Sequence, residues 1–219
     1  MPWSLTWTEW VCPSSGIRCI RVSGEAVLRA FGKENAVPFN EAMCEGDASA
    51  DIFGGEFVSL RVKSLETTEK EYRSRVLLPL EPFFALPKKL RFVFGADMFC
   101  AVNLLTLAAF LAKKGYRGET AAYILNDETD LAGGYSVFEN ITENAWSCYE
   151  KLLLSGQMPD KPPAFFGEEN AARYLDYKNG GKIAAYIAAH RGEDGLLAGL
   201  MSRFADYGLG DRQYLKLIK

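Results

Sequence analysis

Carboxylates gather directly after four apparent β-strands in the first two-thirds of this chain. They lie in four short polar stretches, which are Ser23-Gly24-Glu25, Phe39-Asn40-Glu41 continuing to Cys44-Glu45-Gly46, Gly95-Ala96-Asp97, and Asn126-Asp127-Glu128. Ligands of open parallel α/β sheets bind outside the carboxyl ends of the strands. The sequence therefore predicts that these residues converge on one crevice.

An acidic crevice of this kind is suited to a hard divalent cation. The carboxylates of Glu25, Glu41, Glu45, Asp97 and Asp127 offer the oxygen ligands that magnesium and calcium prefer, and such ions often bridge to a substrate phosphate. Without a metal or an arginine, the same carboxylates repel a phosphate. The alternative is structural, because Asp97 stands at a helix N-cap and Glu25 in a first helical turn. For these two residues taken singly, the structural interpretation is favoured.

The loop that begins at Asn40 has no capping or packing role that its pattern reveals. It contains Glu41 and Glu45. Because loops carry binding sites disproportionately, a functional role for Glu41 or Glu45 is favoured as strongly as a structural one. Asn103 lies two turns into an apolar helix, where a buried amide needs hydrogen-bond partners. We expect Asn103 to hold a loop such as 40–46 in place.

Cysteine chemistry is less favoured by the sequence. Cys100 falls in the first turn of a helix, where the helix dipole favours a thiolate, and Cys44 lies in the polar loop. A cysteine nucleophile usually needs a histidine base, and the only histidine, His190, stands far along the chain at a helix end. Both cysteines are therefore interpreted as small core or loop residues. The five cysteines form no C-x-x-C pair and are odd in number, which argues against a disulfide framework and favours a reducing cytoplasm.

Composition and motifs exclude several classes of function. The chain has 219 residues, a net charge of −3 and 48% hydrophobic residues, which is ordinary globular composition without a basic field for nucleic acid. It has no G-x-G-x-x-G after a strand, no P-loop, no H-E-x-x-H and no G-x-S-x-G. The longest apolar stretch, 100–112, contains Asn103 and is too short to span a bilayer. We expect no membrane association.

The hydrophobic pattern predicts an α/β fold with a mainly parallel sheet flanked by helices, followed by an all-helical C-terminal subdomain. Strands are predicted at 17–22, 36–39, 90–94 and 120–125, and helices at 26–31, 53–64, after a capping box at Thr68 to Glu71, and at 98–113. Four more helices are predicted at 168–177, 182–189, 196–204 and 211–218. The predicted divisions are an N-terminal extension (1–16), an α/β domain (17–134) and a helical subdomain (135–219).

Three segments resemble a bacterial domain family of unknown function, numbered eighteen thirty-five. They are Pro38-Phe39-Asn40-Glu41-Ala42-Met43-Cys44-Glu45-Gly46, the stretch from Phe94 to Leu105, and Tyr207-Gly208-Leu209-Gly210-Asp211-Arg212-Gln213-Tyr214. The first predicted strand also ends in Gly24-Glu25, similar to the Gly-acid pair of that family. The resemblance covers roughly residues 17–219. It implies the fold and no particular activity.

These observations lead to two functional hypotheses. In the first, the chain binds a small polar ligand, nucleotide-like or metal-bridged, in the crevice at the strand ends. Its enzymatic version is a hydrolase or transferase in which Glu41, Glu45 or Asp97 acts as general base or metal ligand. In the second, the chain is a regulatory or scaffold protein whose C-terminal helices bind a protein partner or DNA. Nucleic acid is the weaker partner, because the last helix offers few cations.

Overall fold

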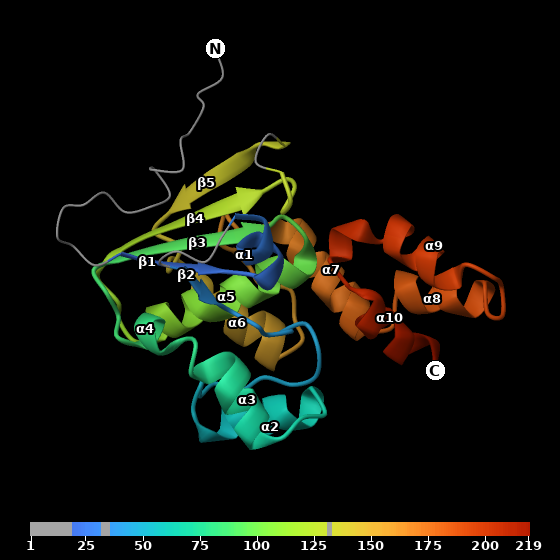
Figure 1. Ribbon diagram of the computed structural model, residues 1–219, viewed down its shortest axis with the longest axis horizontal. Helices are drawn as coiled ribbons and strands as arrows, with labels where there is room; N and C mark the ends of the chain where they lie inside the picture. Colours follow the sequence, from blue (N-terminus) through green and yellow to red (C-terminus); the bar gives the residue numbers. More distant parts are fainter. Residues whose placement is uncertain (1–18, 32–35, 131–132) are drawn as a thin grey trace, which may run out of the picture.

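The computed structural model describes residues 19–31, 36–130 and 133–219, so the predicted extension 1–16 and the first two residues of the predicted strand 17–22 lie outside the described residues. The strands described form one sheet in the order β2-β1-β3-β4-β5 (Figure 1). Their bounds are β1 Cys19–Ser23, β2 Ala36–Pro38, β3 Lys89–Gly95, β4 Glu119–Leu125 and β5 Tyr135–Glu139. The pairs β1/β2, β1/β3 and β3/β4 are parallel, whereas β4/β5 is antiparallel. The predicted mainly parallel sheet is confirmed.

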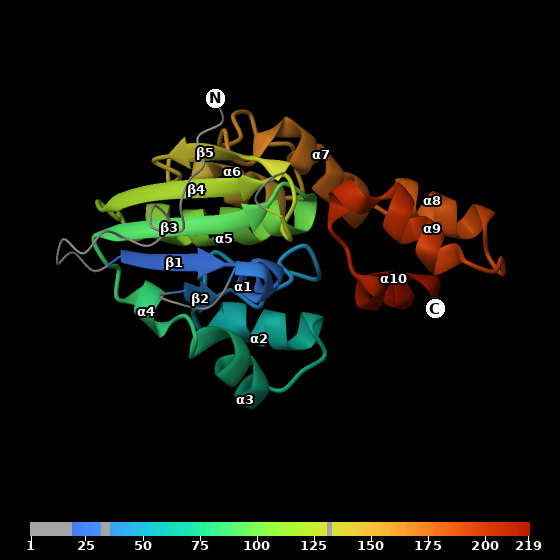
Figure 2. The same cartoon turned by 45° about the horizontal axis from the view of Figure 1, so that its top comes forward.

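One face of the sheet is covered by a long buried helix, α5 (Met98–Lys113). Side chains alternate between the two faces of a strand, so Phe92 and Phe94 of β3 join the main core together with α5. The helix begins where predicted, because Asp97 at the N-cap accepts a hydrogen bond from the backbone N–H of Cys100. Figure 2 shows α5 running behind the sheet. The α6 helix (Ala145–Tyr149) and the α7 helix (Gly167–Lys178) pack against α5.

The opposite face carries the short helix α1 (Glu25–Phe31). Val27 of α1, Val93 of β3 and Leu125 of β4 form a small second cluster there. Glycine and aspartate at the end of β3 then lead directly into α5. Strands β1 and β3 are each followed at once by a helix, so the residues after them lie close to the carboxyl ends of these two neighbouring strands.

Short helices fill the connection between β2 and β3. These elements are α2 (Gly55–Ser64), α3 (Glu69–Tyr72), the π-helical turn η2 (Arg73–Leu77) and α4 (Glu81–Phe84). The predicted capping box is present, since the side chains of Thr68 and Glu71 each bond to the backbone N–H of the other residue. This connection forms one wall of the candidate site described below.

The remaining elements are helical: η4 (Glu150–Leu154), α8 (Lys182–Ala189), α9 (Leu196–Arg203), η5 (Ala205–Tyr207) and α10 (Asp211–Ile218). Of these, α8, α9 and α10 extend beyond the strand ends (Figure 1). The four helices predicted after residue 167 match α7 to α10 closely. Strand β5 was not predicted, and it starts at the border proposed between 134 and 135. Its residues are partly or fully exposed at the sheet edge, so they lack the apolar pattern of an internal strand. Among the described residues, no helix has the length and apolar character needed to cross a bilayer.

Candidate functional site

Six of the residues singled out from the sequence line a single cleft of about 970 Å³, whereas Asp127 lies outside it. The cleft opens at the carboxyl ends of β1, β2 and β3, and β1 lies between β2 and β3 in the sheet. The connection after β1 leads to β2 on one side, and the next connection leads to β3 on the other side of β1. The carboxyl end of β1 is therefore a topological switch point, where open α/β sheets bind ligands. The lining includes Glu25, Asn40, Glu41, Glu45, Asp97 and Asn103, joined by Arg75, Cys100, Glu128, Gly208, Arg212, Gln213 and Lys216.

Asp97, Cys100 and Glu128 form the most compact polar group in the cleft, with one potential ligand atom of each residue within 4.8 Å of the others. The thiol of Cys100 donates to Oε1 of Glu128 at 3.0 Å, and the backbone N–H of Gly95 donates to the same oxygen at 3.1 Å. Oδ1 of Asp97 accepts from the Cys100 N–H at 2.9 Å. Because one oxygen of each carboxylate is used in this way, the second oxygens are the ones a hard cation or a ligand would engage.

Burial controls the ionisation of this group. Burial raises the pKa of Asp97, and the nearby charge of Glu128 raises it further. Burial also raises the pKa of Cys100 well above its usual value, with Asp97 and Glu128 adding to the effect. The pKa of Cys44 is raised as well, mainly by burial. Both cysteines are therefore thiols at neutral pH, in agreement with the structural interpretation and against an activated nucleophile.

A glycine from the C-terminal part lies directly against Asp97. Gly208 has a φ of +67°, and a Cβ built there would overlap the Asp97 carboxylate. Gly95 is similarly confined, because its Cβ would lie 2.7 Å from Oδ2 of Asp97 and 2.9 Å from Oε1 of Glu128. These two glycines permit the close approach of backbone to the carboxylates.

Glu41 is fully engaged by protein groups. Its carboxylate accepts from Nε and Nη2 of Arg61, both at 3.0 Å, from the hydroxyl of Tyr72 at 2.7 Å, and from the N–H of Ala42 at 2.6 Å. The side chains of Glu41 and Arg61 are both 0% exposed. Burial disfavours the charged guanidinium, but the carboxylate of Glu41 outweighs this and raises the pKa of Arg61. Glu41 is therefore a structural residue with no oxygen left for a cation.

Arg61 also fixes the loop that follows β2. Its guanidinium donates to the carbonyl oxygens of Ala42 at 2.9 Å, Glu45 at 2.6 Å and Asp47 at 3.1 Å. The side chain of Asn103 completes the support: it accepts from the N–H of Met43 at 3.0 Å and donates to the carbonyl of Glu41 at 2.7 Å. The expected role of Asn103 in holding this loop is confirmed.

Glu45 joins the loop to the end of the chain. Its two oxygens accept from Nε2 of Gln213 and from Nζ of Lys216, each at 2.9 Å. Gln213 and Lys216 belong to α10, so α10 forms a wall of the cleft. The carboxylate of Glu45 is mostly buried, with 11% of its side chain exposed.

The other residues proposed from sequence have more local partners. Glu25 pairs with Arg29 on the exposed face of α1 at 2.7 Å, and the amide of Asn40 donates to the carbonyl of Arg75 at 3.3 Å. Asp127 does not line the cleft; it accepts from the N–H and hydroxyl of Thr129 instead. The neighbouring Glu128 faces the cleft. The Asp-x-Thr spacing is typical of such a local turn, and it is the sequence signal that distinguishes the turn residue Asp127 from the cleft residue Glu128.

Cations at the cleft are the main feature that sequence reasoning missed. Arg75 of η2 and Arg212 and Lys216 of α10 line it. In the described part of the chain, the guanidinium groups of Arg75 and Arg212 form no hydrogen bond or ion pair. Hydrogen bonds from Thr67 and Thr68 lower the pKa of Glu71, and the charge of Arg75 adds to this effect. The cleft is therefore acidic at the strand ends and basic at Arg75, Arg212 and Lys216 on the walls contributed by η2 and α10, although Glu66 and Glu71 also line it.

Two further expectations concern cysteine and histidine. Cys19 is disulfide-bonded, which departs from the expectation of reduced cysteines, whereas Cys44, Cys100 and Cys148 are free. His190 stacks on Tyr186 with ring centroids 4.0 Å apart and does not line the cleft. The interpretation of His190 as a helix-end residue holds, since it is the C-cap of α8.

Comparison of the chain with models of protein families, with curated proteins and with solved structures found no match. The function of this protein is therefore inferred from the residues of the cleft.

Proposed function

We propose that this protein binds a small polar ligand, nucleotide-like or metal-bridged, in the cleft at the carboxyl ends of β1, β2 and β3. The observation that carries the proposal is the convergence on one cavity of about 970 Å³ of strand-end carboxylates and of two arginines whose guanidinium groups form no hydrogen bond or ion pair with the described residues. This volume lies at the upper end of the range typical for ligand pockets, roughly 300–1,000 Å³. A mixed lining of this kind suits a ligand that carries both an anionic group and neutral polar groups.

The basic wall supports an anionic group in the ligand. Arg75 and Arg212 provide planar guanidinium groups that match phosphate or carboxylate oxygens. Lys216 is already paired with Glu45 and would contribute a third positive charge nearby. These cations offset part of the repulsion between a phosphate and the acidic residues of the cleft, which also include Glu66 and Glu71.

The acidic end supports a metal-bridged or hydroxyl-bearing ligand. Asp97 and Glu128 each retain an oxygen for a divalent cation, and magnesium is commonly held by one or two carboxylates plus substrate phosphate. In an enzymatic version of the proposal, Asp97 is the general base, because its raised pKa brings a carboxylate nearer to the working range of such a group. Glu41 and Glu45 are unsuited to this role, since their oxygens are already engaged.

Membership of the domain family numbered eighteen thirty-five stays a prediction, and so does a cytoplasmic location. The disulfide of Cys19 counts against a reducing compartment, because structural disulfides are rare in the cytosol.

The test is thermal unfolding in the presence of nucleotides, sugar phosphates and divalent metals, each alone and in pairs. The parent is compared with Glu128→Gln and Arg212→Gln, which leave the buried ion pair of Glu41 intact. Asp127→Asn and Arg117→Gln are the matched controls, because both positions lie outside the cleft. We expect one ligand class to raise the melting temperature of the parent and the controls, with at least a tenfold weaker affinity in the cleft variants. Equal stabilisation of all five proteins, or of none, would contradict the proposal.

A further inference from the structure

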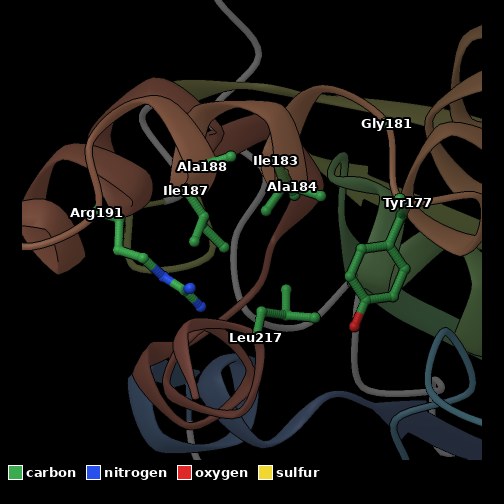
Figure 3. Close-up of a pocket in the computed structure, with 9 residues that line it drawn as sticks. Tyr177, Gly181, Ile183, Ala184, Ile187, Ala188, Arg191 and Leu217 are labelled. Carbon is green, nitrogen blue, oxygen red and sulfur yellow. The ribbon is translucent and has the colours of Figure 1, made fainter.

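A second cavity of about 380 Å³ lies between α8 and α10, away from the cleft. Figure 3 shows Ile183, Ala184 and Ile187 of α8 pointing toward Leu217 of α10 across this groove. Leu217 keeps 42% of its surface exposed. The groove and the cleft share no lining residue, although α10 contributes to both.

Polar groups stand at the two ends of the apolar lining. The guanidinium of Arg191 and the hydroxyl of Tyr177 both extend from the groove wall, at opposite ends of the view in Figure 3. The Arg191 side chain and the Tyr177 hydroxyl have no hydrogen-bond or ion-pair partner within the described ranges. Ligand sites typically combine an apolar lining with a few polar groups that set the ligand's orientation.

The geometry points to a binding site for a small amphipathic carboxylate, such as a medium-chain acyl acid, whose chain occupies the groove while its carboxylate pairs with Arg191. The hydrocarbon part would lie against the exposed Leu217, Ala184 and Ala188, with the nearly buried Ile183 and Ile187 forming the floor of the groove. Removal of apolar surface from water favours such binding. The single positive charge selects an anion at one end, and guanidinium binds carboxylate through two parallel hydrogen bonds. This inference is independent of the ligand proposed for the cleft.

Two alanines on α8 allow the groove to be filled without disturbing the core. Ala184 lines the groove and Ala185 does not, yet both are exposed on the same helix. Ala184→Phe therefore blocks the groove, and Ala185→Phe adds the same side chain beside it. For the charge, Arg191→Gln is paired with Arg117→Gln, which changes the net charge equally at a distant exposed position.

The experiment is calorimetric titration of the full chain with decanoate, below the concentration at which it forms micelles, with decanol and propionate as probes lacking the charge or the chain. We expect saturable binding of decanoate, at least tenfold tighter than that of either probe. Arg191→Gln should weaken decanoate binding about tenfold, the loss expected for about 1.4 kcal/mol. Ala184→Phe should abolish it, and Ala185→Phe and Arg117→Gln should bind as the parent does.

Three results would overturn the inference. The first is an absence of decanoate binding to the parent. The second is equal binding by Ala184→Phe and Ala185→Phe, which would indicate adsorption elsewhere. The third is sedimentation showing a dimer that Ala184→Phe dissociates and Ala185→Phe does not, because the groove would then be occupied by a second copy of the chain.

Discussion

The carboxylate of Glu41 and the guanidinium of Arg61 face each other in a bidentate ion pair from which solvent is excluded on both sides. The pair connects the loop after β2 with helix α2. Replacing one member leaves the other as an uncompensated buried charge, whose cost exceeds that of losing an exposed pair.

We therefore expect Glu41→Gln to lower the free energy of unfolding by about 3 kcal/mol or more, the usual cost of breaking a buried pair. Urea denaturation at neutral pH measures it. Glu56→Gln, on an exposed position of α2, is the control and should cost less than about 0.5 kcal/mol. Similar stabilities for the two variants would contradict the structural role of Glu41.

Asn103→Leu should release the loop that Asn103 supports. The substitution leaves the N–H of Met43 and the carbonyl of Glu41 buried without this partner, at a cost of about 2–5 kcal/mol for two groups. Amide hydrogen exchange at Met43 should become faster in Asn103→Leu, because its N–H loses this acceptor. Thr106→Val removes a hydroxyl that bonds only to a carbonyl within α5 and should cost about 1 kcal/mol, with Met43 protection unchanged. Unaltered exchange at Met43 in Asn103→Leu would refute the proposed link.

Ionisation of Asp97 should lower the free energy of unfolding as the pH rises above 3.8, the ordinary pKa of this carboxyl group. Its folded-state pKa is raised, so between the two values the folded chain binds more protons than the unfolded chain, and the free energy of unfolding decreases with pH. Asn caps a helix as well as Asp does, so Asp97→Asn removes this dependence while keeping the cap. Urea denaturation between pH 4 and pH 7 measures it: Asp97→Asn should gain stability relative to the parent until the pH passes the folded-state pKa of Asp97. A constant difference across that range would show that Asp97 titrates normally.

Glu128→Gln should make Cys100 more reactive. The charge of Glu128 contributes to the raised pKa of the Cys100 thiol, so its removal increases the thiolate fraction at a given pH. Alkylation with iodoacetamide at pH 8, followed by peptide mass spectrometry, should be faster by up to about tenfold for each pKa unit recovered. Asp127→Asn changes the charge of an exposed neighbour and should leave the rate near that of the parent. The opposite order of these two rates would exclude Glu128 as the cause.

Local sequence patterns predicted those structural roles that depend on residues nearby in the chain. Asp97 could be assigned to an N-cap because an aspartate directly precedes an apolar helix, and Asn103 could be assigned to loop support because a buried amide must find partners. The partner of Glu41 could not be predicted, since Arg61 lies 20 residues further on and looks like any other helix arginine. Arg75 and Arg212 join the cleft only through tertiary packing. An exposed strand such as β5 is equally hard to identify, because it lacks the buried pattern of β3.

Glu45 and its two partners on α10 are separated by 168 and 171 residues of sequence, and this separation determines when the cleft is assembled. During synthesis, the sheet and α5 can pack long before α10 has been translated. Two of the three cations of the cleft, Arg212 and Lys216, arrive with α10, and so does the outer wall of the apolar groove. Both cavities are thus completed in the same late step, and a nascent chain that stops before α10 carries the acidic end of the cleft with Arg75 but without Arg212 and Lys216.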